Sequence, residues 1–225
     1  MINVNQTGMT KWLVMPVVLL ALVLCSSCSE SDGETDNEYT DWQSKNDTFM
    51  KDLEQQYQAN PTAWVKLKKN LQDKVVVVNS SETTTETGKY VYAQVLEKGT
   101  GTQDILYTDS VAVHYMGYLI PTEKHPDGYV FDQSFSGESW ADFNDHVALP
   151  TKFAVNSLVI GFSTALQTMH VGDTWKVYIP YQLGYGSSDS GVIPAYSTLI
   201  FYIKVAAVWH VDESHAEFQS REIEW

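Results

Sequence analysis

Cysteine is nearly absent from this sequence. Two of the 225 residues are cysteines, Cys25 and Cys28, and both lie close to the N-terminus. The remainder of the chain can therefore contain neither a disulfide framework nor a zinc site built from pairs of cysteines. A chain of this length is large enough to bury a sizeable core, so any fold that it forms must depend on hydrophobic packing.

Positive charge is scarce as well. The chain carries 14 lysine and arginine residues against 28 aspartate and glutamate residues, which gives a net charge of −14. Nucleic acids are bound chiefly by basic side chains that neutralise phosphates. Because no window of the sequence gathers lysine and arginine together with aromatic residues, we exclude nucleic acid as a partner.

The usual catalytic groups are also missing. The six histidines show no paired metal spacing, and no glycine-rich phosphate loop follows a predicted strand, so we expect neither a metal nor another cofactor. Residues 137–141 partly match a nucleophile elbow, but no predicted strand leads into them, which disfavours a serine hydrolase. An enzyme of this composition would have to catalyse a reaction that breaks no covalent bond.

No apolar run is long enough to span a membrane, but one is typical of a signal peptide. Lys11 precedes an apolar run over residues 12–24, which is well short of the roughly 20 residues of a membrane span. Cys28 follows two serines and resembles the lipidated cysteine of bacterial lipoproteins. It fits better than Cys25, which follows Val23-Leu24. The expected signal peptide is residues 1–27, with Met1 or Met9 as the start and plain secretion as the alternative.

Residues 28–38 are small and acidic, which predicts a flexible tether after the lipidated cysteine. Acidic residues in this place resemble the surface-export signals of Bacteroidetes lipoproteins, although any soluble tether would have a similar composition. The expected location is therefore the cell envelope, with a lipid anchor in the outer membrane and the protein either periplasmic or surface-exposed.

The segment 39–88 predicts an N-terminal helical extension that ends in the start of a β-hairpin. Trp42, Phe49 and Leu53 lie on one face of a helix expected over residues 39–57. Asn60-Pro61 is typical of a helix start and predicts a second helix, in which Trp64, Leu67 and Leu71 share a face. Such apolar faces either cover the domain that follows or pair two copies of the chain as a homodimer. The β-branched run 75–78 and the polar turn 80–88 begin the hairpin.

Alternation of apolar and polar residues predicts a series of strands after this extension. The strands are expected at 89–96, 111–115, 129–132, 152–155, 174–179 and 198–205. One short helix, over residues 163–169, comes just before the last two strands. Several strands with a single helix indicate an α+β fold with an antiparallel sheet. The charged tail 209–225 is expected to lie on the surface.

Several short motifs occur in the order found in one enzyme family. They are Val113-His114-Tyr115, Phe131-Asp132, Phe153, Leu158-Val159-Ile160-Gly161-Phe162, Met169-His170-Val171-Gly172, Ile179-Pro180, Gly184-Tyr185-Gly186, Ile193-Pro194 and Thr198-Leu199-Ile200-Phe201. Their order resembles FKBP-type peptidyl-prolyl cis-trans isomerases over residues 89–208. The resemblance implies a twisted antiparallel sheet wrapped around the helix 162–169.

The resemblance also implies a pocket of aromatic and aliphatic side chains. Its catalytic positions would be Tyr115, Phe131, Asp132, Phe162 and Tyr185, and its substrate-binding positions Phe153, Leu158, Val159, Ile193 and Phe201. The family often has tryptophan where this chain has Phe162. The loops 117–130 and 133–150 are longer than in minimal members. The second carries Trp140 and Phe143, which would contact client proteins or pack onto the sheet or the helix 42–57.

Such a pocket would bind a proline-containing polypeptide and favour the twisted X-Pro amide, whose carbonyl is less polar than that of the planar amide. The Tyr185 hydroxyl and the backbone N–H of Val159 or Ile193 would hold the substrate carbonyls on either side of the bond. Asp132 would hold Tyr115 or a rim group and would not transfer a proton. The function expected is a prolyl isomerase that assists the folding of exported proteins. The alternative is a binding module of the same fold with vestigial activity.

The two N-terminal cysteines make the anchor testable. We expect Cys28→Ala to abolish membrane attachment, because only Cys28 follows two small residues and precedes the acidic tether. The matched variant Cys25→Ala should stay in the membrane fraction. Cell fractionation measures both, and release of the Cys25 variant alone would move the lipidation site to Cys25.

Overall fold

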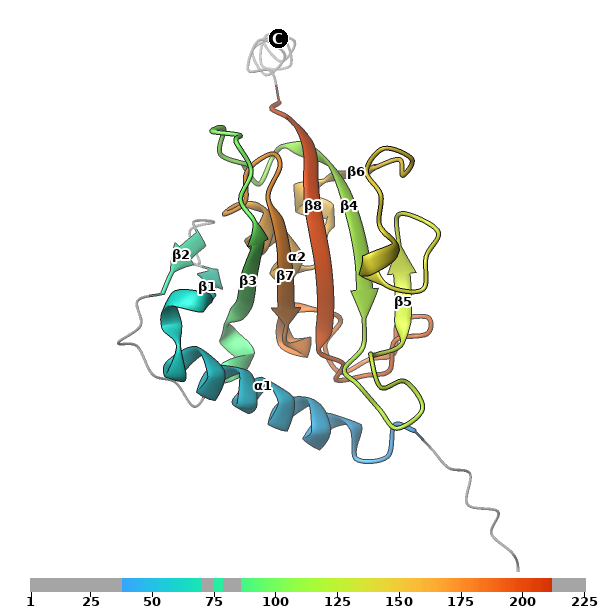
Figure 1. Cartoon of the computed structure of the whole chain (residues 1–225). Coiled ribbons are helices and arrows are strands. Elements are labelled where there is room, and N and C mark those ends of the chain that lie inside the picture. Colours follow the sequence, from blue (N-terminus) through green and yellow to red (C-terminus); the bar gives the residue numbers. More distant parts are fainter. Residues whose placement is uncertain (1–37, 70–74, 79–85, 212–225) are drawn as a thin grey trace, which may run out of the picture. The chain divides into compact units, whose positions relative to one another are not determined.

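The computed structural model describes residues 38–69, 75–78 and 86–211 (Figure 1). The predicted signal peptide, both cysteines, nearly all of the tether, most of the polar turn 80–88 and the tail from residue 212 lie outside these ranges. The described residues belong to one compact unit of the chain. Among them, no helix is both long enough and apolar enough to cross a membrane.

The described residues form one antiparallel sheet with two α-helices. The strands are β1 (Val65–Lys69), β2 (Val75–Val77), β3 (Val91–Glu97), β4 (Ser110–Tyr118), β5 (Val130–Gln133), β6 (Thr151–Ala154), β7 (Thr174–Ile179) and β8 (Leu199–Trp209). Their order is β2-β1-β3-β7-β8-β4-β5, and β6 pairs with β4 beside β5. The helices are α1 (Trp42–Ala59) and α2 (Ile160–Leu166). This arrangement confirms the predicted α+β class.

Single turns of 3-10 helix connect several of these elements. They lie at Pro61–Ala63, Thr87–Lys89, Trp140–Asp142, Val155–Ser157 and Tyr181–Leu183. Two of them matter for the site: the turn Val155–Ser157 leads from β6 into α2, and the turn Tyr181–Leu183 leads from β7 into a long loop that returns to β8. Both loops therefore begin next to a strand of the sheet.

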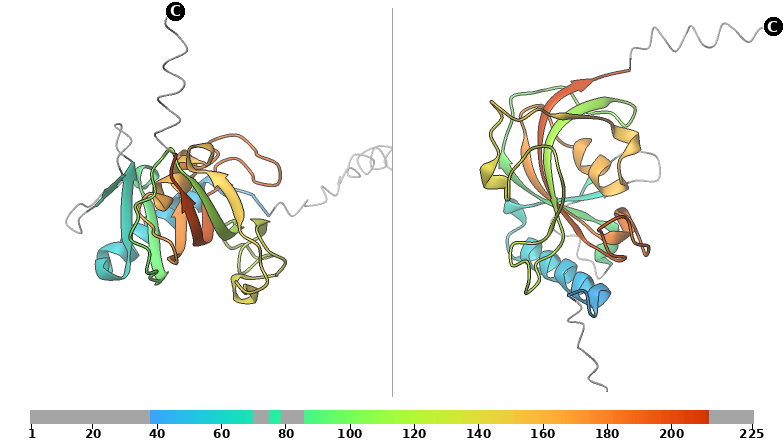
Figure 2. Two further views of the ribbon diagram at one scale, coloured as in Figure 1. Left: turned by 90° about the horizontal axis from the view of Figure 1, so that it is seen from above. Right: turned by 90° about the vertical axis from the view of Figure 1, so that its right-hand side faces the viewer.

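The short helix α2 lies inside the curve of the sheet (Figure 2), and every residue from Gly161 to Leu166 is buried. Gly161 makes this close packing possible. A Cβ atom added there would lie 2.2 Å from Cγ2 of Ile179 on β7, so any side chain would push the helix away from the sheet. The helix predicted at 163–169 is therefore confirmed, although it begins at Ile160 and ends at Leu166.

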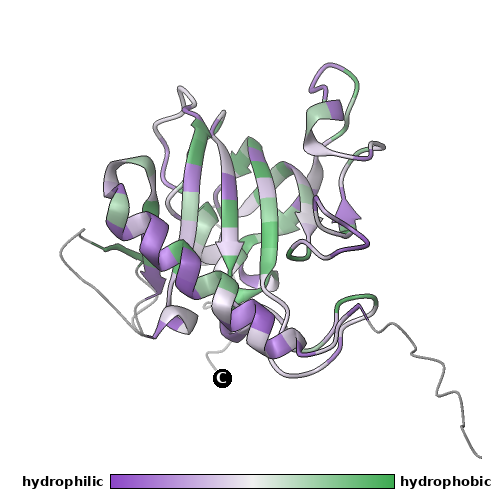
Figure 3. Cartoon of the chain, turned by 60° about the horizontal axis from the view of Figure 1, so that its bottom comes forward, coloured by the Kyte–Doolittle hydropathy of each residue, from purple (hydrophilic) through white to green (hydrophobic). Residues whose placement is uncertain are grey.

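The helix α1 crosses the end of the sheet (Figure 1) and covers it with the apolar face that the sequence predicted. Its Trp42, Met50, Leu53 and Tyr57 side chains are buried in the core. Figure 3 shows hydrophilic residues along the length of this helix, whereas the strands behind it are largely hydrophobic. Of the two uses predicted for the apolar face of α1, covering the domain is the one observed.

The second predicted helix is wrong. Asn60-Pro61 begins only the 3-10 turn Pro61–Ala63, and the chain then continues as β1, which pairs with β3 on one side and with β2 on the other. Three apolar residues at helical spacing could not distinguish a helix from a strand. The open edge of β3 decided the outcome, because its backbone groups need hydrogen-bond partners that β1 supplies. A strand was predicted at 75–78 and is present as β2, but the hairpin that it was expected to begin with the strand 89–96 is wrong, because β2 pairs with β1, which lies between β2 and β3.

A buried ion pair fastens α1 to β1. The Lys66 ammonium lies 2.8 Å from Oε2 of Glu54, and the Tyr92 hydroxyl donates a hydrogen bond of 2.6 Å to the same oxygen. The Lys66 side chain is fully buried and also lies over the Tyr90 ring, with Nζ 4.4 Å from the ring centroid. Burial by itself raises the pKa of Glu54, but the hydrogen bonds from Lys66 and Tyr92 outweigh it, so the pKa lies below its ordinary value.

This ion pair predicts an asymmetric response to mutation. Glu54→Leu should lower the free energy of unfolding by about 3–5 kcal/mol, because the buried Lys66 loses its carboxylate, whereas replacing both charges (Glu54→Leu with Lys66→Met) should cost only about 1 kcal/mol. Urea denaturation measures both. Because the pKa of Glu54 is lower in the folded protein, the unfolded chain takes up the proton first as the pH falls below 4.5, and the wild type then loses the stability that the carboxylate gives it. The loss measured for Glu54→Leu should therefore shrink with falling pH.

The exposed pair Lys89–Glu86 provides the control for this experiment. Glu86→Gln should leave the free energy of unfolding nearly unchanged, because an exposed ion pair is screened by solvent. A cost for Glu54→Leu no larger than that of Glu86→Gln would contradict the structural role assigned to the buried pair.

Candidate functional site

Aromatic rings from five elements meet on the concave side of the sheet. They are Tyr115 on β4, Phe131 on β5, Phe153 on β6, Phe162 on α2 and Phe201 on β8. The centroid distances are 4.9 Å for Phe162–Phe201, 5.4 Å for Phe131–Phe201 and 5.7 Å for Tyr115–Phe153, and the first two pairs are edge-to-face. The structure thus brings together five of the six aromatic residues that the sequence analysis placed in one pocket, the sixth being Tyr185. We call these five rings the aromatic cluster.

The aromatic cluster has a buried floor and an accessible rim. Phe162, Phe201 and Tyr115 are 3%, 5% and 7% exposed, whereas Phe131 and Phe153 are only half-buried. Leu158 and Val159, which precede α2, are half-buried and pack against the same core. An apolar surface that is built into the core and still reaches solvent is the kind of site that binds an apolar group of a ligand.

The position of Tyr115 follows from how β4 shares its partners. Residues 110–113 of β4 pair with β6, whereas residues 116–118 pair with β5. Ser134 fills the interval, since its Oγ accepts a hydrogen bond from the Tyr115 N–H (2.8 Å) and its N–H donates one to the Tyr115 carbonyl (3.0 Å). The strand therefore stays paired while the Phe131 and Phe153 strands diverge on either side of Tyr115.

Gly117 is a site residue that the sequence analysis missed. A Cβ atom at this position would lie 2.6 Å from Cζ of Phe131 and 2.7 Å from Cε1 of Phe201. The two rings can meet only because β4 has no side chain there. A glycine in the middle of a strand is a recognised sign of close approach, so the signal was present in the sequence.

Asp132 holds the Tyr115 ring in place from the rim. The Tyr115 hydroxyl donates a hydrogen bond of 2.9 Å to Oδ2 of Asp132, and Oδ1 of Asp132 accepts one of 2.9 Å from the Gln133 N–H. Burial raises the pKa of the Tyr115 hydroxyl, and the hydrogen bond to Asp132 raises it further. Tyr115 therefore stays a neutral donor, and Asp132 orients it as an acceptor.

Tyr185 lies on the long loop between β7 and β8 and is 44% exposed. Burial of part of the ring raises the pKa of its hydroxyl, and the charge of Asp132 at the rim of the cluster raises it further. Among the described residues it makes no hydrogen bond. Gly186 follows with a φ of 73°, a left-handed conformation that favours glycine. Tyr185 therefore offers a protonated donor at the rim of the cluster.

The two backbone donors that the sequence offered are not equivalent. The Ile193 N–H donates a hydrogen bond of 3.0 Å to the Ser190 carbonyl, so it is already used within the loop. The Val159 N–H, at the N-terminus of α2, makes no hydrogen bond to the described part of the chain. The Ile193 side chain is buried in the core. Of the two N–H groups, only that of Val159 is available to a ligand.

The long loop 133–150 packs on the opposite face of the sheet. The Trp140 ring is stacked on Tyr202 at 5.5 Å and on Phe143 at 4.6 Å. Tyr202 follows Phe201 in β8, so its side chain points away from the aromatic cluster. Of the packing partners predicted for Trp140 and Phe143, the sheet is the one observed.

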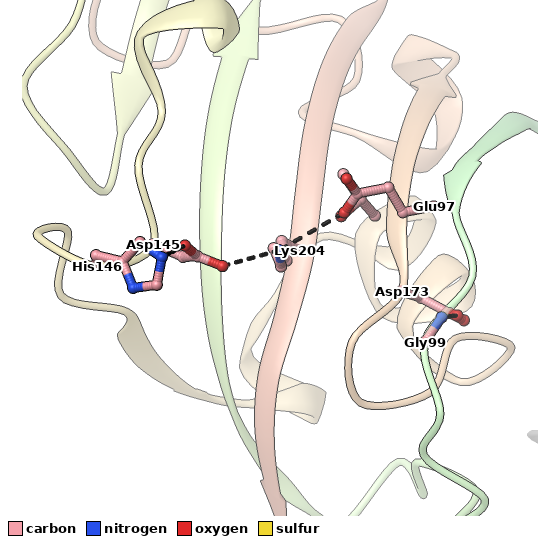
Figure 4. A network of polar contacts seen from close by, with 7 residues as sticks. Glu97, Gly99, Asp145, His146, Asp173 and Lys204 are labelled. Atoms are coloured by element: carbon pink, nitrogen blue, oxygen red, sulfur yellow. Dashed lines mark hydrogen bonds and ion pairs between the residues drawn. The ribbon is translucent and has the colours of Figure 1, made fainter.

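Ion pairs of Lys204 hold this loop on the sheet. Lys204 on β8 lies 3.1 Å from Oδ2 of Asp145 and 3.5 Å from Oε2 of Glu97, so it bridges the loop and the end of β3 (Figure 4). Burial lowers the pKa of Lys204, but the hydrogen bond to Asp145 and the charge of Glu97 outweigh it and raise the pKa. Lys204 therefore stays charged.

In the described part of the chain, no cluster of histidine, cysteine or acidic residues could hold a metal ion.

The comparisons with known proteins agree with this geometry. Residues 101–206 match the family model of FKBP-type peptidyl-prolyl cis-trans isomerases. The chain is 34% identical over 116 residues to the macrophage infectivity potentiator of Trypanosoma cruzi, an alignment covering 51% of each chain. It is 39% identical over 103 residues to the FKBP-type 22 kDa peptidyl-prolyl cis-trans isomerase of Escherichia coli, covering 45% of this chain and 42% of that protein. The alignments thus span about half the length of these relatives.

A solved structure extends the comparison to the fold. The crystal structure of FkpA from Escherichia coli superposes with a TM-score of 0.50 at 23% identity, over 76% of this chain and 62% of that chain. The two chains therefore share a fold, a curved antiparallel sheet around one short helix. Over residues 101–206, a little less than half of the chain, the sequence is similar to the FKBP-type peptidyl-prolyl cis-trans isomerase family.

The close approach at Gly117 is testable by a single methyl group. Gly117→Ala should lower the free energy of unfolding by about 1–3 kcal/mol, because the new Cβ overlaps the Phe131 and Phe201 rings. Urea denaturation measures the loss. In Phe131→Leu, where one ring is removed, the same alanine should cost less. Equal costs in the two backgrounds would show that the Phe131 ring does not restrict position 117.

Proposed function

We propose that this protein is a peptidyl-prolyl cis-trans isomerase that acts on proline-containing polypeptides in the cell envelope. The observation that carries the proposal is the aromatic cluster, whose floor is buried while its Phe131 and Phe153 rim remains accessible. The FKBP-type family match of the same residues supports it.

The reaction suits a site without nucleophile or metal. Rotation about a peptide bond has a barrier of about 18–20 kcal/mol, because the planar amide is stabilised by resonance. The twisted amide has lost that resonance, and its carbonyl is less polar. An apolar site therefore binds the twisted amide in preference to the planar one, which is the differential binding that lowers the barrier.

The described residues supply the groups for this binding. Phe162 and Phe201 would form the floor beneath the proline ring, with walls made by the residues Phe131, Phe153, Leu158, Val159 and Ile193. The Tyr185 hydroxyl and the Val159 N–H would each donate a hydrogen bond to a substrate carbonyl. Two fixed donors on either side of the proline would hold the flanking peptide while the X-Pro bond turns. Asp132 would orient Tyr115 in the wall of the site.

The location in the envelope is part of the proposal. Its support is the apolar run 12–24, the cysteine at position 28 and the acidic segment that follows. A relative named outer membrane protein MIP, from Legionella longbeachae, is 34% identical over 116 residues. We propose that Cys28 carries a lipid that holds the protein at the outer membrane. A homodimer through the N-terminal helices would have to use the hydrophilic side of α1, since the apolar side is buried in the domain.

The isomerase activity is tested with a protease-coupled proline-peptide assay. Phe162→Ala and Phe131→Ala should each lower kcat/KM at least tenfold, which corresponds to about 1.4 kcal/mol of barrier. Because loss of a buried phenylalanine also costs about 3–5 kcal/mol of stability, circular dichroism must show that the variants are folded under the assay conditions.

A control is available on the other face of the sheet. Phe135 packs against Trp140 and Phe143, away from the aromatic cluster, so Phe135→Ala should keep the wild-type kcat/KM. If the folded wild type catalyses no isomerisation, the chain would be a binding module of the same fold. If Phe135→Ala loses as much activity as Phe162→Ala, the cluster would not be the site.

A further inference from the structure

The N-terminal helix α1 holds the loop that carries Tyr185, although the two are about 140 residues apart in the sequence. The Trp42 Nε1–H donates a hydrogen bond of 2.8 Å to Oγ of Ser197, and the Thr198 N–H donates one of 2.7 Å to Oδ1 of Asn46. Both hydrogen bonds are buried. In the right-hand view of Figure 2, the loop between β7 and β8 lies beside α1.

Asn46 is an unusual residue for its position. It lies one helical turn from Trp42 and one from Met50, so it occupies the middle of the buried apolar face and is 0% exposed. A buried amide is costly unless its polar atoms are hydrogen-bonded. Both ends are bonded here, because Nδ2 of Asn46 also donates to the Trp42 carbonyl at 2.8 Å. An aliphatic side chain would pack equally well but could not accept the Thr198 N–H.

These hydrogen bonds lead directly to Tyr185. Ser197, which accepts from Trp42, donates its own hydroxyl to the Pro194 carbonyl at 2.6 Å. The preceding residue, Tyr196, donates its N–H to the Gly186 carbonyl at 2.9 Å, which fixes the residue next to Tyr185. The hydrogen bonds Trp42–Ser197 and Tyr196–Gly186, together with the peptide bonds between neighbouring residues, therefore connect α1 to Tyr185.

Tyr196 itself indicates that the loop is held under strain. Its φ of 63° is left-handed, a conformation that is costly for a bulky side chain and persists only where the surroundings impose it. Its N–H is bonded to Gly186, its ring lies 5.2 Å from that of Tyr181, and the next two residues are bonded to α1. Without α1, the last of these restraints would be lost.

We propose that Trp42 and Asn46 are positioning residues for the isomerase site, holding the loop 184–198 so that Tyr185 and Ile193 stay at the aromatic cluster. The inference rests on the proposed function, which it deepens by giving the N-terminal helix a part in catalysis. Neither residue touches the substrate. Both act through Ser197, Thr198 and the bond between Tyr196 and Gly186.

Hydrogen exchange on the full protein tests the positioning directly. In Asn46→Ala, amides 184–198, the Thr198 N–H above all, should exchange about tenfold faster, because loss of a buried hydrogen bond increases local opening by about that factor. The amides of β4 should keep their protection. Trp42→Phe keeps an aromatic ring, although a smaller one, and removes the donor. Ser197→Ala removes the same hydrogen bond from the loop side, so both variants should show a smaller change of the same kind.

Leu53→Ala is the matched control. Leu53 is buried on the same face of α1 but makes no contact with the loop through a hydrogen bond, so its loss should destabilise the helix packing without selective exchange in 184–198. Unchanged protection of the loop in Asn46→Ala, Trp42→Phe and Ser197→Ala would overturn the inference. Equal loss in Leu53→Ala would do so as well.

A double-mutant cycle with Tyr185→Phe shows whether the restraint acts through Tyr185. Asn46→Ala should lower kcat/KM about fivefold when Tyr185 is present and by less than about twofold in Tyr185→Phe, because residues that act through one another are not additive. Additive losses would overturn the inference. If the wild type has no isomerase activity, the proposed function fails, and the exchange measurements alone decide whether α1 holds the loop.

Discussion

The geometry of the site depends on the pairing of β4. One edge of this strand pairs with β8 along its whole length, from Ser110 opposite Trp209 to Tyr118 opposite Ile200. The other edge is divided between β6 and β5, and Ser134 satisfies the Tyr115 backbone where one partner gives way to the next. Because the backbone groups of a buried strand must all be paired, this division fixes where Phe131 and Phe153 stand relative to Tyr115.

The aromatic cluster is mainly apolar, whereas two buried polar pairs lie at the N-terminal helix. Lys66 with Glu54 and Asn46 with Thr198 are both found where α1 meets the sheet. An apolar contact tolerates a shift of register, but a buried polar group is costly in every arrangement except the one that pairs it. The helix is therefore held in one position on the domain, next to the loop that carries Tyr185.

The prediction of strands was most accurate where one stretch of sequence contained all of the information. The strand 174–179 was predicted with the bounds of β7, since strict alternation ends there at a proline. The helix predicted after Asn60-Pro61 was wrong, because Val65 to Lys69 could satisfy either period and the free edge of β3 decided between them. In the same way, the N–H of Ile193 looked available until the turn with Ser190 placed an acceptor beside it.

The sequence by itself determined the α+β class, the series of strands from β3 onward and, through the family resemblance, the membership of the aromatic cluster. These follow from local alternation, from turn residues and from motifs that keep their order whatever the three-dimensional contacts are. Only the tertiary structure decided the partners of Asn46, which rings approach Gly117 and the face of the sheet on which Trp140 packs. Each of these depends on groups far apart in the sequence, and no local pattern records which distant backbone or ring a side chain will meet.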